Sequence, residues 1–168
     1  ARCNQDAVEK NEIATLASVL ELAPESKPLA EYVATLQKGI RETAKGNALD
    51  IDAAMKAYAS ALGCAPVKIE LTAEEKAAAK VYPKSTAKVL ESGYGVMRTI
   101  SPELMAKYGF NKRGAVINGG EIAKLTTSGT NSILDIKKML DAQFPVGDSL
   151  ETITNYVKML EEAGLVTF

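Results

Sequence analysis

The sequence predicts a mainly α-helical protein, with an up-down four-helix bundle in residues 1–92 and a small α/β module in residues 93–168. Three observations favour this fold class. Apolar residues recur at helical spacing through most of the chain, glycines and prolines divide it at short intervals, and two apolar runs near 115–125 flank an Asn-Gly turn. With 46% hydrophobic and 24% charged residues, the composition is that of an ordinary globular protein.

Four amphipathic helices are expected in the first part, over residues 6–22, 26–46, 50–62 and 72–91. Pro24 ends the first helix, and Ser26 is expected to be the N-cap of the second. The second ends near Gly46 and the third at Gly63, and a capping box at Thr72 starts the fourth. Pro83 should kink or break that last helix before residues 85–91 resume it. Because the connecting turns are short, neighbouring helices should run antiparallel as a bundle.

The second part begins after the Ser-Gly-Tyr-Gly stretch at 92–95, which favours a domain boundary. A short helix is expected from Ser101 to Gly109. The runs 115–117 and 121–125 are then separated by Asn118-Gly119-Gly120, which is a strong signal for a β-hairpin. Residues 165–168 would add a third strand beside that hairpin.

Residues 132–168 have the pattern of two amphipathic helices separated by a Pro-Val-Gly-Asp turn. Their apolar positions are Ile133, Ile136, Leu140 and Phe144 in the first and Leu150, Ile153, Val157 and Leu160 in the second. Asp148, followed by Glu151, predicts the start of the second helix, and Gly164 predicts its end.

The segment SLETITNYVKMLEEAGLV at 149–166 resembles the recognition-helix segment of winged-helix proteins. The expected hairpin precedes the helices, which is similar to the peptide-binding winged helices of modified-peptide biosynthesis. This resemblance implies a winged-helix-like module that takes a peptide as an added strand. Winged helices also bind DNA, so a DNA-binding regulator remains the alternative.

Charge argues against nucleic acid as the partner. The chain has 20 basic and 21 acidic side chains, for a net charge of −1. Of the side chains expected on the outer face of the second helix, only one is basic; they are Glu151, Thr152, Thr154, Asn155, Lys158 and Glu162. A DNA-binding surface needs several basic side chains, so we expect no nucleic-acid partner.

The sequence displays no catalytic motif. It contains no histidine, which removes the commonest general base and the commonest metal ligand. Two distant cysteines cannot supply a zinc site, and the glycine patterns of phosphate-binding loops are absent. We therefore expect a protein that is not an enzyme and that carries no cofactor or metal.

No apolar run approaches the roughly 20 residues that span a bilayer.

The two cysteines and the start of the chain favour an exported protein. A disulfide between Cys3 and Cys64 would tie the N-terminus to the bundle, whereas two separate thiols would fit a reducing compartment. The sequence starts at Ala1 without a methionine, as expected of a processed chain or of a fragment.

Residues 6–91 resemble, in architecture only, the four-helix Q-type extrinsic proteins on the lumenal side of photosystem II. This resemblance implies a non-enzymatic accessory subunit that docks on a larger, membrane-associated protein complex. The compartment would then be the thylakoid lumen, the periplasm or the extracellular space. The alternative is a cytoplasmic winged-helix transcriptional regulator with a helical N-terminal domain.

A basic and aromatic cluster around the expected hairpin is the candidate docking surface. Its residues are Lys107, Tyr108, Phe110, Lys112, Arg113 and Lys124. Aromatic and arginine side chains are enriched at the centres of protein interfaces, so this cluster would meet an acidic surface of the partner. In the alternative interpretation, Tyr108 and Phe110 pack in the joint between the two parts.

Overall fold

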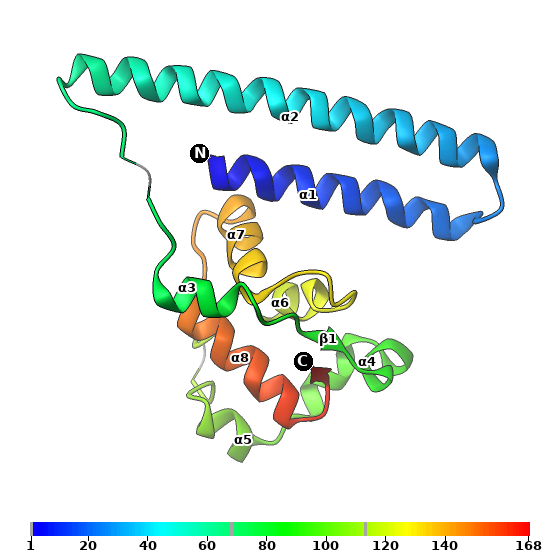
Figure 1. Cartoon of the computed structure of the whole chain (residues 1–168). Helices are drawn as coiled ribbons and strands as arrows, with labels where there is room; N and C mark the ends of the chain where they lie inside the picture. Colours follow the sequence, from blue (N-terminus) through cyan, green and yellow to red (C-terminus); the bar gives the residue numbers. More distant parts are fainter. Residues whose placement is uncertain (1, 68, 113) are drawn as a thin grey trace. The chain divides into compact units, whose positions relative to one another are not determined.

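The computed structural model describes residues 2–67, 69–112 and 114–168, apart from the side chains of residues 2 and 3. The protein is mainly helical, as predicted, and carries a small two-stranded sheet (Figure 1). The chain divides into two compact units, which we call unit 1 (Ala1–Ile69) and unit 2 (Glu70–Phe168). The glycines at 93 and 95, which favour a boundary by sequence, lie inside unit 2, where neighbouring Val96 is buried in the core.

Unit 1 is a hairpin of two helices. Helix α1 (Arg2–Ser18) continues into the 3-10 helix η1 (Val19–Leu22), and helix α2 (Lys27–Ala61) follows. Ser26 caps α2 as predicted, because its side-chain oxygen accepts a hydrogen bond from the Leu29 backbone N–H at 3.4 Å. With 35 residues, α2 is about 52 Å long.

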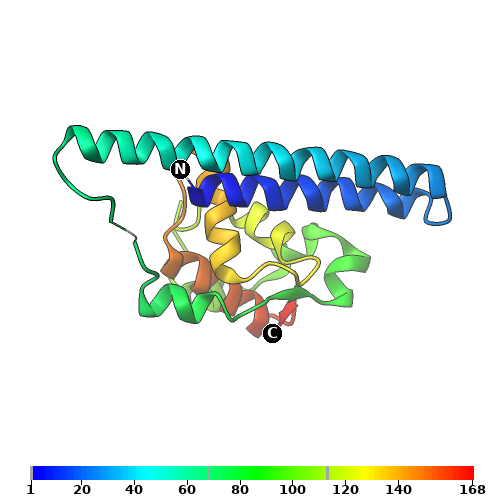
Figure 2. The same cartoon turned by 45° about the horizontal axis from the view of Figure 1, so that its top comes forward.

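Two polar contacts fix how α1 lies along α2. The Gln37 side-chain amide donates to the Ile13 carbonyl at 3.1 Å, and the Asn47 amide donates to the Gln5 side chain at 3.4 Å. The helices therefore run antiparallel, and their register places the start of α1 level with about residue 49 of α2. Beyond that level α2 continues to Ala61, and in Figures 1 and 2 its last turns extend past the beginning of α1.

The two helices predicted over 26–46 and 50–62 are one continuous helix, so the predicted stop at Gly46 is wrong. A single glycine inside a helix costs only about 1 kcal/mol relative to alanine. The apolar stripe of α2 keeps its phase across Gly46, from Ala44 to Ile51, so packing outweighs that cost. Within the described residues unit 1 is a two-helix hairpin, and the predicted four-helix bundle is not found.

Unit 2 surrounds one apolar core. Its elements are, in chain order, α3 (Ala73–Ala78), β1 (Lys84–Ser85), α4 (Ala87–Ser92), the 3-10 helix η2 (Tyr94–Thr99), α5 (Pro102–Lys107), α6 (Gly119–Leu125), α7 (Ile133–Gln143), α8 (Leu150–Glu162) and β2 (Val166–Thr167). The centre of the core comes from the apolar stripes of α7 and α8, with fully buried Ile136, Leu140, Ile153, Val157 and Leu160. These are the stripes that the sequence predicts.

The caps of α7 and α8 show why these helices begin and end where they do. Ser132 and Asp135 form a reciprocal capping box at the start of α7, and the Ser149 side chain accepts the Thr152 N–H at the start of α8. At the end of α8, Gly164 has a positive φ of 70°. The N–H of Leu165 then reaches the carbonyl of Leu160 at 2.9 Å, which closes the helix in a Schellman motif.

The predicted C-terminal strand exists but pairs elsewhere. Strand β2 lies antiparallel to β1, with Lys84 opposite Thr167 and Ser85 opposite Val166. Pro83 breaks the predicted fourth helix, as expected, and the chain then enters β1. Residues 72–92 thus belong to unit 2 as two short helices around a strand, instead of forming a bundle helix.

The predicted β-hairpin at 115–125 is wrong, because residues 119–125 form helix α6. The backbone N–H groups of Ile117 and Asn118, which a hairpin ladder would use, donate instead to the two carboxylate oxygens of buried Asp148, both at 2.8 Å. Gly119 follows, and a Cβ there would lie 3.0 Å from the Tyr156 hydroxyl oxygen. The glycine therefore serves a close helix contact and not a tight turn.

Candidate functional site

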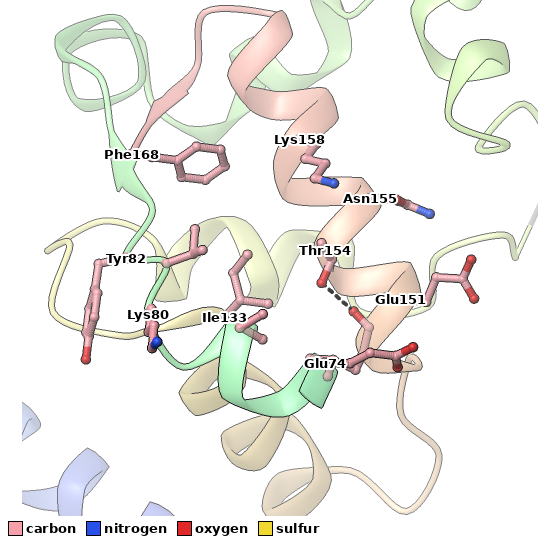
Figure 3. Close-up of a pocket in the computed structure, with 13 residues that line it drawn as sticks. Glu74, Lys80, Tyr82, Ile133, Glu151, Thr154, Asn155, Lys158 and Phe168 are labelled. Carbon is pink, nitrogen blue, oxygen red and sulfur yellow. Dashed lines mark hydrogen bonds between the residues drawn. The ribbon is translucent and has the colours of Figure 1, made fainter. Parts of the chain in front are cut away.

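The candidate site is a pocket of about 850 Å³ in unit 2, between α3 and α8 (Figure 3). Helix α3 and the residues after it form one side, α8 forms the other, and the start of α7 and Phe168 complete the lining. This volume falls in the range of about 300–1,000 Å³ that is typical of ligand pockets.

The floor of the pocket is apolar. It is lined by Ala77, Ala78, Val81, Ile133, Leu150 and Phe168. Ile133 and Ala78 are buried in the core, whereas Phe168 is 55% exposed and Ala77 is exposed. A contiguous apolar lining that remains open to solvent is characteristic of a binding site.

Local hydrogen bonds hold the walls in place. The Ile133 N–H donates to the Val81 carbonyl at 3.0 Å and so ties the start of α7 to the segment that follows α3. The Thr72 capping box, which the sequence predicts, fixes the start of α3 through Glu75. Pairing of β2 with β1 positions the backbone next to Phe168.

The rim of the pocket carries charges of both signs. Glu74 and Glu151 lie in the first turns of α3 and α8, where a carboxylate is favoured by the helix dipole. Lys80 follows the end of α3, and Lys158 lies about two turns further along α8 than Glu151. Figure 3 shows Glu74 and Glu151 near one end of the pocket and Lys80 near the other end.

Uncharged polar groups complete the rim, and they are Tyr82, Thr154 and Asn155. The Thr154 hydroxyl donates to the Leu150 carbonyl at 2.8 Å, so it belongs to the hydrogen bonding of α8 (Figure 3). The side-chain amide of Asn155 and the exposed phenol of Tyr82 can each donate and accept a hydrogen bond to a bound molecule.

Part of this site follows from the sequence and part does not. Thr154, Asn155, Lys158 and Glu151 are predicted to face outward from the second helix, and they do form one wall. The opposite wall, from Glu74 to Tyr82, is missed because the sequence assigns that stretch to a helical bundle. Pro83 is a local signal that the helix predicted over 72–91 is interrupted, but it does not indicate where residues 74–82 pack.

The described members of the predicted docking cluster have different surroundings in the structure. Lys107 and Tyr108 both contact Glu162 of α8: the lysine Nζ lies 2.7 and 2.6 Å from the two carboxylate oxygens, and the Tyr108 hydroxyl donates at 2.9 Å. The hydrogen bond from Lys107, and after it the one from Tyr108, lowers the pKa of the Glu162 carboxyl. The hydrogen bond between Lys107 and Glu162 also raises the pKa of Lys107. Both side chains therefore already have a partner within unit 2.

The other described members of the cluster differ in burial and in partner. Phe110 is buried and packs edge-on against Tyr156, with ring centroids 5.5 Å apart, so it is a core residue. Lys124 pairs with Glu121 at 2.7 Å, and Lys112 is exposed. Arg113 lies outside the described residues.

The structure does not support the predicted disulfide. Cys64 is an exposed free thiol, and the side chain of Cys3 lies outside the described residues. The register of the hairpin places the start of α1 level with about residue 49, roughly 12 residues before the end of α2, which is about 18 Å along the helix. The Cα atoms of a disulfide lie within about 7 Å of each other, so this hairpin keeps Cys64 out of reach.

Comparison with protein-family models, with curated proteins and with solved structures finds no match. Among the described residues no three histidine, cysteine or acidic side chains gather where they could bind a metal ion. No described helix combines the length and the apolar character that a membrane span requires.

Proposed function

We propose that the protein is a non-enzymatic docking subunit and that unit 2 binds a segment of a partner protein in the pocket between α3 and α8. The observation that carries this proposal is the apolar floor of the pocket, which is open to solvent and bordered by charges of both signs. Such a site anchors an apolar side chain while polar groups at the rim orient the segment that carries it.

The charges of the rim indicate the kind of segment. Two carboxylates, Glu74 and Glu151, lie where α3 and α8 begin, and two ammonium groups, Lys80 and Lys158, lie further along. A peptide with one or two apolar residues between a basic and an acidic residue would complement this arrangement. Because the rim carries both signs of charge, it complements neither a strongly acidic nor a strongly basic ligand.

A protein segment is a better candidate than nucleic acid. Several lysines of unit 2 are paired with carboxylates, among them Lys107 with Glu162, Lys124 with Glu121 and Lys137 with Asp141. The face of α8 that lines the pocket opposite α3 carries one carboxylate, Glu151, and one ammonium group, Lys158. Phosphate contacts require uncompensated basic side chains, so we do not propose the DNA-binding alternative. Docking on a larger complex in an exported compartment stays a prediction from the sequence.

The test is selection of linear peptides from a displayed random library on the whole protein, followed by affinity measurement with the selected peptides. The Ala77→Trp substitution places a large side chain in the pocket. The Ala106→Trp substitution makes the same change at an exposed alanine of α5, a helix of the same length as α3 outside the pocket. We expect the first change to weaken binding about tenfold or more and the second to leave it unchanged.

Circular dichroism of both variants checks that unit 2 remains folded. If no peptide is enriched, or if both tryptophan variants bind the selected peptides equally well, the pocket is not the docking site. Enriched peptides that carry only one sign of charge would contradict the proposed role of the four rim charges.

A further inference from the structure

Unit 1 displays an apolar face that α1 does not cover. The stripe of α2 that packs on α1 passes through Val33 and Ala44, and it continues at the same helical phase after Asn47. Its later positions are Ile51, Met55, Tyr58 and Leu62. Met55 is 49% exposed, Tyr58 is 70% exposed and Leu62 is 62% exposed. The uncovered face therefore continues an existing helix–helix interface.

The segment after α2 makes this face concave. Ala65, Pro66 and Val67 return beside the helix, and together with the stripe they line an apolar hollow of about 520 Å³. Large aliphatic and aromatic side chains together on one surface indicate an interaction site, whereas single exposed apolar residues do not. An α-helix that presents apolar residues at the same spacing would pack on this part of α2 as α1 packs on the preceding part.

The spacing of the stripe is symmetric. Its four residues are separated by four, three and four positions, so the pattern is the same in either direction. An antiparallel copy of the same helix would place Ile51 opposite Leu62 of the second copy and Met55 opposite Tyr58. A contact related by a two-fold axis requires this self-complementarity. We propose that this face, formed by residues 51–61 of α2 and the next residue, Leu62, binds the same face of a second copy in an antiparallel dimer.

The flanks of the stripe are compatible with such a dimer. In this pairing Asp52 lies opposite Ala61 of the second copy and Asp50 lies opposite Gly63, so no two like charges face each other. Lys56 projects to the outer side of α2, about 140° from the direction of Val33. Ala54 and Ala61 border the stripe, and small residues there let the two helices approach closely.

The first test measures the oligomeric state of the whole protein by analytical ultracentrifugation over a range of concentrations. Leu62→Glu puts a charge into the proposed interface. Leu49→Glu makes the same change at a leucine of nearly equal exposure, 63% against 62%, on the opposite side of α2. We expect a reversible dimer whose Kd rises about tenfold or more in Leu62→Glu and stays unchanged in Leu49→Glu.

The second test establishes the direction of the helices in a chain whose native cysteines are replaced by serine. Chains carrying Ile51→Cys are mixed with chains carrying Leu62→Cys and oxidised. An antiparallel dimer cross-links the mixture, but neither variant alone, because identical positions lie about 16 Å apart along the axis. The proposal is overturned if the protein is a monomer at every concentration, if the two glutamate variants have equal effects, or if Ile51→Cys cross-links with itself. A monomer would mean that this face binds a different protein.

Discussion

Asp148 is the buried carboxylate that joins the turn before α8 to the loop before α6. It is 5% exposed, and its two oxygens accept the N–H groups of Ile117 and Asn118 at 2.8 Å each. The sequence predicts Asp148 as the cap of α8, but Ser149 takes that role. The short carboxylate of an aspartate can serve either as a helix cap or as a long-range acceptor, so sequence alone does not distinguish the two roles.

Replacing Asp148 by alanine should destabilise unit 2. The change leaves two backbone N–H groups without their acceptor, and we expect a loss of about 2–3 kcal/mol in the free energy of unfolding, measured with urea. Asp141→Ala is the control: Asp141 is exposed and pairs with Lys137 on the surface of α7. That change should cost less than about 1 kcal/mol. Equal losses in the two variants would contradict the structural role of Asp148.

Adjacent glycines at the start of α6 should respond oppositely to alanine. A Cβ at Gly119 would lie 3.0 Å from the Tyr156 hydroxyl oxygen and 3.1 Å from the ring carbon that bears it, whereas a Cβ at Gly120 meets nothing within 4 Å. Gly119→Ala should therefore cost about 1–3 kcal/mol, because the ring must move. Gly120→Ala should be neutral or stabilise by up to about 1 kcal/mol. Thermal unfolding compares them, and a destabilised Gly120→Ala would refute this account.

At the scale of elements, the sequence predicts well where a signal is local. The helices α5, α7 and α8 and the caps at Ser26, Thr72 and Ser101 all follow from nearby residues. The predictions fail where a distant group decides the outcome. Asn118-Gly119 has the chemistry of a hairpin turn, but Asp148, about 30 positions away, accepts the N–H groups that the hairpin needs.

The candidate site shows the same limit. One wall, on α8, is predicted because the helix periodicity separates buried from outward residues. The other wall depends on α3 packing against the rest of unit 2, which no local pattern in residues 72–82 indicates. Conversely, Gly46 is a local breaker that the continuous stripe of α2 overrides.

At the scale of the whole molecule, the two units differ in how much core they contain. Unit 2 holds a connected apolar cluster that includes many fully buried aliphatic residues. Among the described residues of unit 1, Val33 is the only buried one larger than alanine. A unit with so little buried apolar surface has little to offset the entropy of folding, so we expect it to gain stability from the proposed contact with a second copy.

Separate expression of the two units tests this difference. Residues 70–168 alone should unfold cooperatively on heating, since the core cluster lies within them. Residues 1–69 alone should lose helix over a broad range, at a temperature that rises with protein concentration if the antiparallel dimer forms. Circular dichroism at several concentrations follows both fragments. A cooperative, concentration-independent transition of 1–69 would contradict the inferred lack of a core.

The pairing of β1 with β2 has a consequence for how the protein is made. Lys84 and its partner Thr167 are 83 positions apart, and at about 5–20 residues per second a ribosome needs roughly 4–17 s to add that stretch. Throughout that interval the part of unit 2 that is already synthesised lacks β2, whose Val166 is buried in the core. Nascent chains of this protein therefore expose apolar side chains for seconds, and a chaperone that acts during translation would have its largest effect then.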